Sequence, residues 1–444
     1  MLFATKKQTL REDTHMKRSG ARTRRAYIVE ALLEYMVSLL VTGAFLAAIL
    51  KQVGVSDALT GVVSSFISFA CVAQLFSSLI VKKGGSVKRR MLVLALINEL
   101  MFSTLYIIPF VPLGQNIKTA LFVAMILGAY LILNLTTPVK YKWLMSFVGA
   151  NERGRFTANK EIVSLIGGML FTLGMGRLVD CCKEIGREQT GFILCGVTMV
   201  AVSLLHMVSI LLCDDEPENA PRPQGDNQLR AIFSMIAGNR TLRKLLLLDI
   251  LWKTAIYIST PYYGTYLIGE LGFSLTFVSA LGVVYGLVRA LASPQCGRIA
   301  DRRGWSSLLT LCLIVAAAGF LVNVFTRPES RMLYLAHYVL YAASMAGINS
   351  GLTNITYDYI DEGCFAQAMG ARNAVSGIVG FLASLLGGAI VSRIQAAGNT
   401  LFGLNVYAQQ VNSAITFALL IALLVYTRLV IARMPRLSGE KSAS

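Results

Sequence analysis

The stretch CDDEPENAPRPQGDNQ (residues 213–228) lies near the middle of the chain and decides how the rest is organised. It is acidic and then rich in proline, and the amphipathic stretch LRAIFSMIAGNRTLRK (229–244) continues it. On each side lie six runs of about 20 mostly apolar residues, the length that a helix needs to cross a bilayer. The runs are 26–51, 57–81, 91–113, 117–138, 160–181 and 190–213 before it, and 244–269, 275–299, 307–326, 332–358, 368–392 and 409–432 after it.

This organisation predicts an all-α polytopic membrane protein with twelve transmembrane helices in two groups. The predicted parts are a basic N-terminal tail (1–25), an N-terminal six-helix bundle (26–213), a linker (214–243), a C-terminal six-helix bundle (244–432) and a short tail (433–444). The composition agrees, since 55% of the 444 residues are hydrophobic and 15% are charged, against about 25% charged in an ordinary soluble domain. A soluble fold, a disordered chain and a small disulfide scaffold are excluded.

The net charge of +17 has a simple explanation in such a protein. Most of the Lys and Arg residues fall in segments on the side of both termini, which predicts that both termini are cytoplasmic. Nucleic acid is therefore not expected as a partner, and a multi-pass protein of the cell membrane is. No CxxC pair occurs among the eight cysteines, the three histidines are far apart, and the nucleotide-binding GxxxxGK[ST] loop is absent. We expect no metal, no cofactor and no enzymatic activity.

The two halves of the chain resemble each other. VGVSDALTGVVSS (53–65) resembles LGFSLTFVSALGVV (271–284), and KEIVSLIGGMLFTLGMG (160–176) resembles RNAVSGIVGFLASLLGG (372–388). The matches occur in the same order in both halves, which indicates a tandem duplication of a six-helix unit.

The motif Gly297-Arg-Ile-Ala-Asp-Arg-Arg-Gly304 follows the eighth run, and it is similar to the signature loop of the major facilitator superfamily. That superfamily consists of transporters with two pseudo-symmetric six-helix halves. In this reading Gly297 permits close helix approach, Gly304 a tight turn, and Asp301 with Arg302 an ion-pair latch. Lys160 and Arg372, at equivalent starts of the fifth and eleventh runs, are expected to join this cytoplasmic gate.

The sequence departs from the family's pattern in two places. In the first half, Val81 stands where the acid of the signature loop is expected and Ser77 where its first glycine is expected. The fifth run has Gly167, Gly168 and further glycines, but it lacks the proline of the drug-antiporter motif. The resemblance therefore favours transport and disfavours drug efflux, and it names no substrate. We read the glycines as positions of close helix packing.

Charged residues inside the predicted spans are the sharpest signal of function, because such groups are costly in a bilayer. Glu30 and Glu34 share one face of the first span, and Asp249 and Lys253 share one face of the seventh at a similar depth. We expect both pairs to face a central cavity, where Lys253 pairs with Glu34 or Asp249 and a carboxyl carries a proton. In the alternative interpretation, Glu30 and Asp249 lie near the headgroups and extend towards water.

Further polar positions are candidates for the substrate site or for proton coupling. Arg289 in the eighth span is expected to bind an anionic group or to neutralise Asp249. Tyr130, Asn134, Tyr257 and Asn349 lie on polar faces that suit a hydroxylated solute, although hydrogen bonding between helices explains such faces equally well. Glu99 is expected either to act in function or to bond to a neighbouring helix.

These observations predict a secondary active transporter that takes up a small polar organic solute by alternating access, together with protons, and acts as a monomer. Two alternatives stay open at this point. One is proton-driven efflux of an amphipathic compound, and the other is a transporter-like membrane sensor without net transport.

Overall fold

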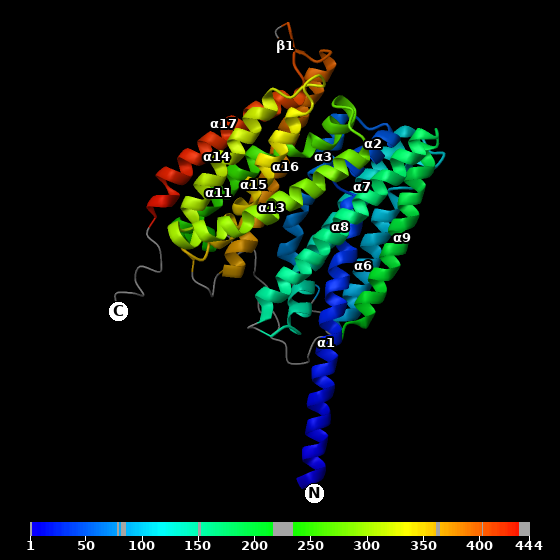
Figure 1. Cartoon of the computed structure of the whole chain (residues 1–444), viewed down its shortest axis with the longest axis vertical. Coiled ribbons are helices and arrows are strands. Elements are labelled where there is room, and N and C mark those ends of the chain that lie inside the picture. The colour runs from blue at the N-terminus through cyan, green and yellow to red at the C-terminus, as the bar shows by residue number, and fades with distance from the viewer. Residues whose placement is uncertain are drawn as a thin grey trace.

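The computed structural model describes residues 2–77, 80, 86–149, 152–215, 234–360, 365–401 and 403–434. Side chains are described from Gly20 onwards, apart from residues 154, 365–367 and 401. Almost all of these residues are helical, apart from a two-stranded antiparallel hairpin, β1 (Thr400–Leu401) with β2 (Leu404–Asn405). The beginning of α1 (Leu2–Leu40) and the end of α17 (Ala408–Leu429) lie at the same end of the molecule (Figure 1). We call this end the terminal face and the opposite end, which carries the hairpin, the far face.

Helices before the central linker pack on one another in one half of the molecule. Contacts join α1 to α8 and α9, and α6 to α7 and α9. Besides α1, this half contains α2 (Gly43–Val53), α3 (Asp57–Ser64), α4 (Phe66–Ala70), η1 (Cys71–Phe76), α6 (Val87–Thr104), η2 (Ile108–Phe110), α7 (Gln115–Met145), α8 (Arg153–Glu184) and α9 (Glu188–Leu212).

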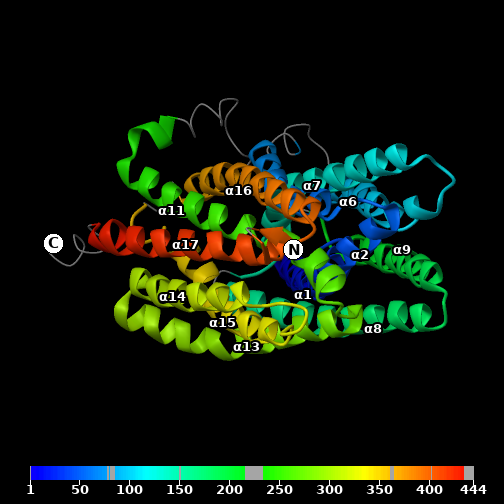
Figure 2. The ribbon, with the colours of Figure 1, turned by 90° about the horizontal axis from the view of Figure 1, so that it is seen from above.

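The second half repeats this arrangement after the linker, and it lies beside the first half in both ribbon views (Figures 1 and 2). Here α14 packs on α15 and α17, and α11 packs on α16 and α17. Besides α17, this half contains α11 (Arg240–Tyr257), η4 (Thr260–Tyr262), α12 (Tyr263–Thr265), η5 (Tyr266–Glu270), α13 (Leu275–Arg303), α14 (Trp305–Val324), α15 (Leu333–Asn354), α16 (Phe365–Ala396) and η7 (Ile431–Arg433).

Each of the twelve predicted spans coincides with a helix or a broken run of helices in the described part of the chain. Eight of these helices are long and apolar enough to cross a membrane, and the bent pair Gly20–Leu40 with Gly43–Val53 makes nine. The other three are α6, α11 and α15. Four charged residues in α6 and five in α11 lower their apolarity, whereas α15 carries many small and polar residues. Length and apolarity alone therefore support nine of the twelve spans.

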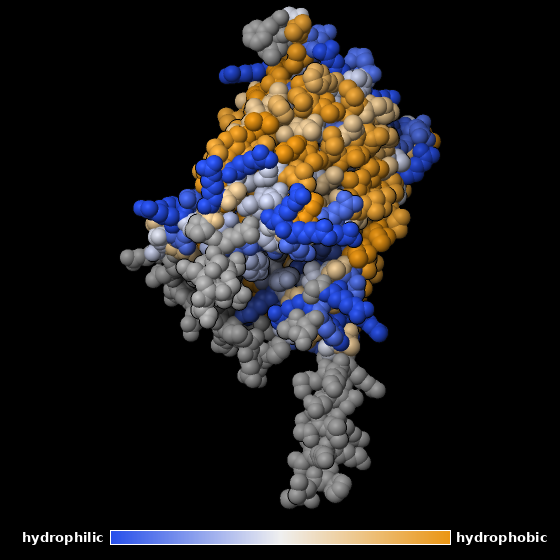
Figure 3. Space-filling model, turned by 60° about the vertical axis from the view of Figure 1, so that its left-hand side comes forward, coloured by the Kyte–Doolittle hydropathy of each residue, from blue (hydrophilic) through white to orange (hydrophobic). Residues whose placement is uncertain are grey.

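Hydrophobic side chains cover a broad band of the outer surface, and hydrophilic side chains gather above and below it (Figure 3). Such a band matches the apolar layer of a bilayer. Large hydrophobic residues on the outside of α9, such as Val197 and Leu204, are about 60% exposed, and this exposure is unfavourable in water. The surface therefore supports the prediction of a membrane protein.

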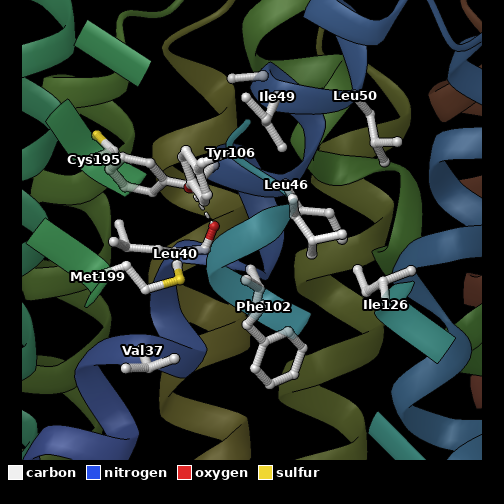
Figure 4. Packing of buried hydrophobic residues seen from close by; sticks show 14 of the residues in the cluster. Val37, Leu40, Leu46, Ile49, Leu50, Phe102, Tyr106, Ile126, Cys195 and Met199 are labelled. Carbon is white, nitrogen blue, oxygen red and sulfur yellow. Dashed lines mark hydrogen bonds between the residues drawn. The ribbon is translucent and has the colours of Figure 1, made fainter. Parts of the chain in front are cut away.

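The first span is broken at Val41–Gly43, where the two helical pieces meet at 44°. A break frees carbonyls that a continuous helix would use, and in a membrane they need new donors. Tyr106 donates its hydroxyl hydrogen to the Leu40 carbonyl at 2.6 Å, and Tyr130 donates to the Val41 carbonyl at 2.7 Å. Tyr106 and Leu40 lie in the buried core of the first half, where Val37, Leu46 and Phe102 surround them (Figure 4).

The two halves meet along α8 with α13, along α3, α4 and η1 with α16, and where α2 contacts α12. Glycines permit the closest approaches. A Cβ atom at Gly61 of α3 would overlap the buried ring of Tyr262, and one at Gly264 would lie 2.6 Å from the Gly43 carbonyl oxygen. Within the first half, Gly167 and Gly168 of α8 approach Leu32 and Tyr35 of α1 in the same way, which confirms them as packing positions.

We expect the substitution Gly61→Ala to destabilise the protein by about 1–3 kcal/mol, because it overfills a packed contact between the halves. Tyr262 has no room to retreat, since its hydroxyl donates to the Ser384 carbonyl. Thermal unfolding of the detergent-purified protein measures the effect. Gly282→Ala in α13, where a Cβ atom meets nothing within 4 Å, is the matched control. An equal midpoint for both variants would contradict the packing argument.

Candidate functional site

A cluster of five ionisable side chains lies inside the first half, among α1, α6, α7 and α9. The Lys140 ammonium lies 2.8 Å from Glu30 Oε1 and 2.5 Å from Glu34 Oε1. His206 places its Nε2 atom 3.3 Å from the same Glu30 oxygen, and its Nδ1 atom contacts Glu99 Oε1. The sequence pattern identified the three acids but missed both Lys140 and His206.

Burial differs sharply within this cluster. The side chains of Glu30, Glu99 and His206 are 1–3% exposed, and that of Lys140 is 13% exposed, whereas that of Glu34 is 32% exposed. A cavity of about 20 Å³, enough for one water molecule, adjoins Glu34, Glu99, Lys140 and His206. The burial of Glu30 rules out the alternative in which this residue extends to the headgroups.

Charge counting separates one acid from the rest of the cluster. Both ring nitrogens of His206 face carboxylate oxygens, so an imidazolium ion donates to both. With His206 in that form, Glu30, Glu99, Lys140 and His206 sum to zero, as a buried set requires. Glu34 is then the surplus acid, and it is also the acid with access to solvent.

The second half holds a separate buried ion pair between α11 and α16. Arg372 contacts both oxygens of Asp249, with its Nη2 atom 2.7 Å from Oδ1, and it donates from the same atom to the Leu352 carbonyl at 3.0 Å. The expected ion pair of Lys253 with Glu34 or Asp249 is therefore not formed in this structure, although Asp249 lies near Lys253. The planar guanidinium of Arg372 binds both oxygens of a carboxylate at once. This geometry favours Arg372 as the partner of Asp249 over the ammonium of Lys253, which lies one turn from Asp249 on α11.

Arg372 was expected at the cytoplasmic gate, and here too the structure differs. The residue is 1% exposed and serves as the partner of Asp249. Asp249 is 8% exposed, so it does not extend to the headgroups either. Both residues belong to the second half, and the pair therefore joins helices within that half.

Predicted site residues from both halves do come together at the centre of the molecule. The Lys253 ammonium lies 5.0 Å from the ring centre of Tyr257, and Tyr257 lies near Tyr130 of the first half. Arg289 is close enough to interact with Tyr35 of α1 and with Tyr285 on its own helix α13.

Three tyrosines of the second half complete this region. Ring centres of Tyr285 and Tyr338 are 5.5 Å apart, and those of Tyr285 and Tyr341 are 6.3 Å apart. Tyr341 also lies near Tyr257. We call Tyr35, Lys253, Tyr257, Tyr285, Arg289, Tyr338 and Tyr341 the central site; all seven are half-buried.

Three other predicted residues, Tyr130, Asn134 and Asn349, lie outside this set. Tyr130 is 1% exposed, and its hydroxyl is used by the Val41 carbonyl. Asn134 accepts a hydrogen bond from Gln74 at 2.9 Å and donates to the Tyr130 carbonyl at 3.0 Å, so it ties α7 to η1. This contact is the helix-to-helix bonding of the alternative interpretation. Asn349 is exposed on α15, and its backbone carbonyl accepts a hydrogen bond from the Thr353 hydroxyl at 3.1 Å.

The expected cytoplasmic gate is not assembled in this structure. Asp301 and Arg302 are exposed, and neither forms an ion pair with any residue that the structure describes. A Cβ atom at Gly297 would meet nothing within 4 Å, so close approach is not the reason for this glycine here. Gly304 does make the expected turn with φ of 81°, and Lys160 lies over the Tyr27 ring at 5.0 Å. Residues 81–85 of the first-half loop, with Val81, lie outside the described residues.

Polar contacts instead join the halves towards the far face. Asp180 at the end of α8 accepts hydrogen bonds from the first turn of α13, at 3.2 Å from the Leu275 amide and 2.7 Å from the Thr276 amide. A carboxylate at a helix N-terminus satisfies free amides and the helix dipole. Ser65 and Ser384 also share a hydrogen bond of 2.7 Å between the halves.

A related contact joins Asp57, the first residue of α3, to the end of α16. Gln395 donates to Asp57 at 2.7 Å and to Glu270 at 3.4 Å. The N-caps Ser56 of α3 and Ser274 of α13 occupy matching places in the sequence repeat. The Asp57 and Asp180 contacts are therefore approximate symmetry mates, and both hold the far face closed.

The Asp57–Gln395–Glu270 contact is expected to weaken as the pH rises from 6 to 8. Burial raises the pKa of the Glu270 carboxyl, which follows the seventh predicted span, to about 7, and the charge of nearby Asp57 acts in the same direction. Below that pH a neutral Glu270 faces Asp57 without repulsion, and above it two carboxylates oppose each other. Other groups near Glu270 include the hydroxyls of Tyr266 and Tyr407, which are neutral throughout this range, and the Arg331 guanidinium, which donates to the adjacent Leu271 carbonyl at 3.4 Å.

Hydrogen exchange of the segment 57–64, corrected for the intrinsic effect of pH, measures this opening. Exchange is expected to be faster at pH 8 than at pH 6 in the wild type and equal at both in Glu270→Gln. Glu329→Gln, an exposed acid on the same face, should behave like the wild type. If exchange in Glu270→Gln still depends on pH, a group other than Glu270 causes the opening.

In the described part of the chain, no group of three or more His, Cys, Asp or Glu side chains is arranged to hold a metal ion.

Comparison with solved structures shows the same fold. The chain is similar to a point-mutant form of the nucleoside transporter NupG (TM-score 0.70, 13% identity, 91% of this chain and 99% of that one). It is also similar to a D-xylose-proton symporter (TM-score 0.68, 13% identity, 91% and 96% covered). A third similar structure is an inward-facing bacterial homologue of the human lysosomal transporter Spinster (TM-score 0.66, 13% identity, 93% and 96% covered).

A search of curated protein sequences gives no match to the chain. Residues 27–384, however, match the sequence model of the Major Facilitator Superfamily, which is most of the chain. The duplicated helical halves, the motif Gly297–Gly304 and the similar transporter folds agree with this match. This chain therefore belongs to the major facilitator superfamily.

Proposed function

We propose that the protein is a secondary active transporter that moves a small polar organic solute across the cell membrane by alternating access, in symport with protons. The observation that carries the proposal is the charge cluster of the first half, with one surplus, solvent-accessible acid beside a buried neutral set. A purely structural cluster has no need for the fifth member, whereas a coupling site requires an acid that gains and loses a proton.

The coupling acid is Glu34, and Lys140 is the residue that responds to it. When Glu34 is ionised, Lys140 is held between two carboxylates, 2.8 Å and 2.5 Å away. When Glu34 is protonated, Lys140 retains only Glu30. The position of Lys140 in α7 thereby depends on the proton, and α7 also carries Tyr130, which lies near Tyr257 of the opposite half.

Alternating access requires that contacts between the halves form at one face and break at the other. The contacts of Asp180 with α13 and of Asp57 with Gln395 hold the far face closed, and the residues expected to form the gate at the terminal face are apart. In the opposite state we expect Asp301, Arg302 and Lys160 to engage and the two far-face contacts to separate.

The similar structures support the class of solute, since their names include a nucleoside transporter and a D-xylose-proton symporter. We further propose that both termini are cytoplasmic, from the distribution of Lys and Arg, and that the protein works as a monomer.

Solute flux into proteoliposomes under an imposed pH gradient tests the proposal and separates the alternatives. Symport predicts accumulation on the side to which protons flow, and efflux by antiport predicts movement against the proton flow. A sensor without transport predicts no flux for any solute that stabilises the protein thermally.

A further inference from the structure

The central site contains two cations, Lys253 and Arg289, that form no ion pair with a described carboxylate. The acids expected to neutralise them are engaged elsewhere: Glu30 and Glu34 with Lys140, and Asp249 with Arg372 on two points. Neither Lys253 nor Arg289 forms an ion pair within 4.0 Å among the described residues. The Asp249 carboxylate lies near Lys253, one turn along α11, but Arg372 binds both of its oxygens. Since Asp249 and Arg372 cancel each other, the wall around Lys253 carries a net positive charge.

A half-buried cation without a counter-ion is costly at the depth of a membrane span, and such residues mark sites for ligands. Lys253 is on α11 and Arg289 on α13, so the two charges approach the centre from different helices. The chain of neighbours Lys253, Tyr257, Tyr341, Tyr285 and Arg289 connects them.

The tyrosines of the central site indicate what the anion is attached to. Tyr257, Tyr285, Tyr338 and Tyr341 present ring faces and hydroxyl groups, which bind a planar ring by stacking and its hydroxyl groups by hydrogen bonds. An inorganic anion has no ring to stack on the faces of these tyrosines. Tyr35 of α1 brings the first half to the same place, so a solute held here touches both halves.

We propose that the transported solute is an organic anion, a carboxylate on a ring, whose charged group is attracted by Lys253 and Arg289 and whose ring packs against the tyrosines. This inference rests on the proposed transport function and specifies its substrate class. It also gives a reason why the deep acids of the first span are paired with Lys140 and Asp249 with Arg372: the cations at the centre stay available to the solute.

Thermal stabilisation of the purified full chain by matched probes tests the charge requirement. The probes are benzoate, 4-hydroxybenzoate and phenylacetate, each compared with its neutral amide at the same concentration. We expect at least one carboxylate to raise the unfolding midpoint with a saturating dependence on concentration, and its amide to have at least a tenfold weaker effect. Equal stabilisation by carboxylate and amide, or no stabilisation by any of the three carboxylates, overturns the inference.

Variants locate the effect. Lys253→Gln and Arg289→Gln should each raise the half-saturating concentration of the carboxylate at least tenfold. Lys51→Gln, which replaces an exposed lysine on the far face, should leave this concentration unchanged. An unchanged value in both central variants places the anion elsewhere and contradicts the assignment. Unfolding midpoints without probe show whether each variant is folded before the comparison is made.

The same probes in proteoliposomes separate this inference from the proposed function. If the carboxylate binds but is not transported, the result contradicts the proposed transport function and is still consistent with the anion site. Flux of neutral amides with none of the carboxylates contradicts the anion site but leaves transport.

Discussion

Replacing Glu34 by glutamine is expected to abolish solute accumulation driven by a pH gradient while downhill exchange of solute continues. Glutamine keeps the size and a hydrogen-bonding oxygen for Lys140 but cannot gain or lose a proton. With one proton per solute, each pH unit is worth about 1.36 kcal/mol, or about tenfold accumulation. The variant should therefore lose about tenfold accumulation for each pH unit of imposed gradient. Its internal solute concentration should rise only to the external concentration.

The measurement is the ratio of internal to external solute in proteoliposomes at a gradient of fixed size. Glu184→Gln serves as the matched control, because the Glu184 side chain is 64% exposed and pairs with the exposed Arg177 at 3.4 Å, at the far face. Accumulation by Glu34→Gln at the wild-type level would show that another group carries the proton. Loss of accumulation in Glu184→Gln would show that the assay responds to acids in general.

Removing one partner of the Asp249–Arg372 pair is expected to have the largest effect on stability. Asp249→Ala leaves the guanidinium of Arg372, which is 1% exposed, without its two-point partner. Breaking a buried pair from one side costs about 3–5 kcal/mol. The hydrogen bonds of Arg372 to the Leu352 carbonyl and to Thr356 remain, but they do not balance its charge.

Unfolding of the purified protein by increasing denaturant measures this loss. The exposed Asp301→Ala is the control and should change the free energy of unfolding by less than about 0.5 kcal/mol. Replacing both partners, as Asp249→Leu with Arg372→Met, should restore most of the stability, because no charge is then left buried. A double variant as unstable as Asp249→Ala would mean that packing, and not the unpaired charge, causes the loss.

The positions of the helices follow from the sequence because a bilayer imposes their length and apolarity. Every apolar run became a helix or a broken helix, including the runs that α6 and α11 form despite their charges. The break of the first span at Val41–Gly43 was not predicted. It depends on Tyr106 and Tyr130, which come from other helices and satisfy the freed carbonyls.

Which charges pair could not be read from the sequence. The apolar run of the fourth span ends at Pro138, so Lys140 was counted with the cytoplasmic loop, whereas α7 continues through that proline to Met145. His206 stands alone in an apolar span, and nothing in its neighbourhood along the chain indicates two acids from other helices. Spacing places residues on one face of a helix, but only packing between helices brings Glu30, Lys140 and His206 together.

The signature loop shows a different limit. Its resemblance to the family identified the fold, and Gly304 makes the expected turn. We propose that the interactions of Asp301, Arg302 and Lys160 form in another state of the transport cycle, because in this structure polar contacts join the halves at the far face. Motifs that act in one state are visible in the sequence at all times, whereas a structure shows the contacts of a single state.

Simultaneous recording of solute and proton movement in proteoliposomes tests the coupling most directly. The account predicts that adding a transported solute starts an inward proton flux, in a constant ratio to solute flux, which disappears in Glu34→Gln. Solute flux of the wild type without any accompanying proton movement would contradict it.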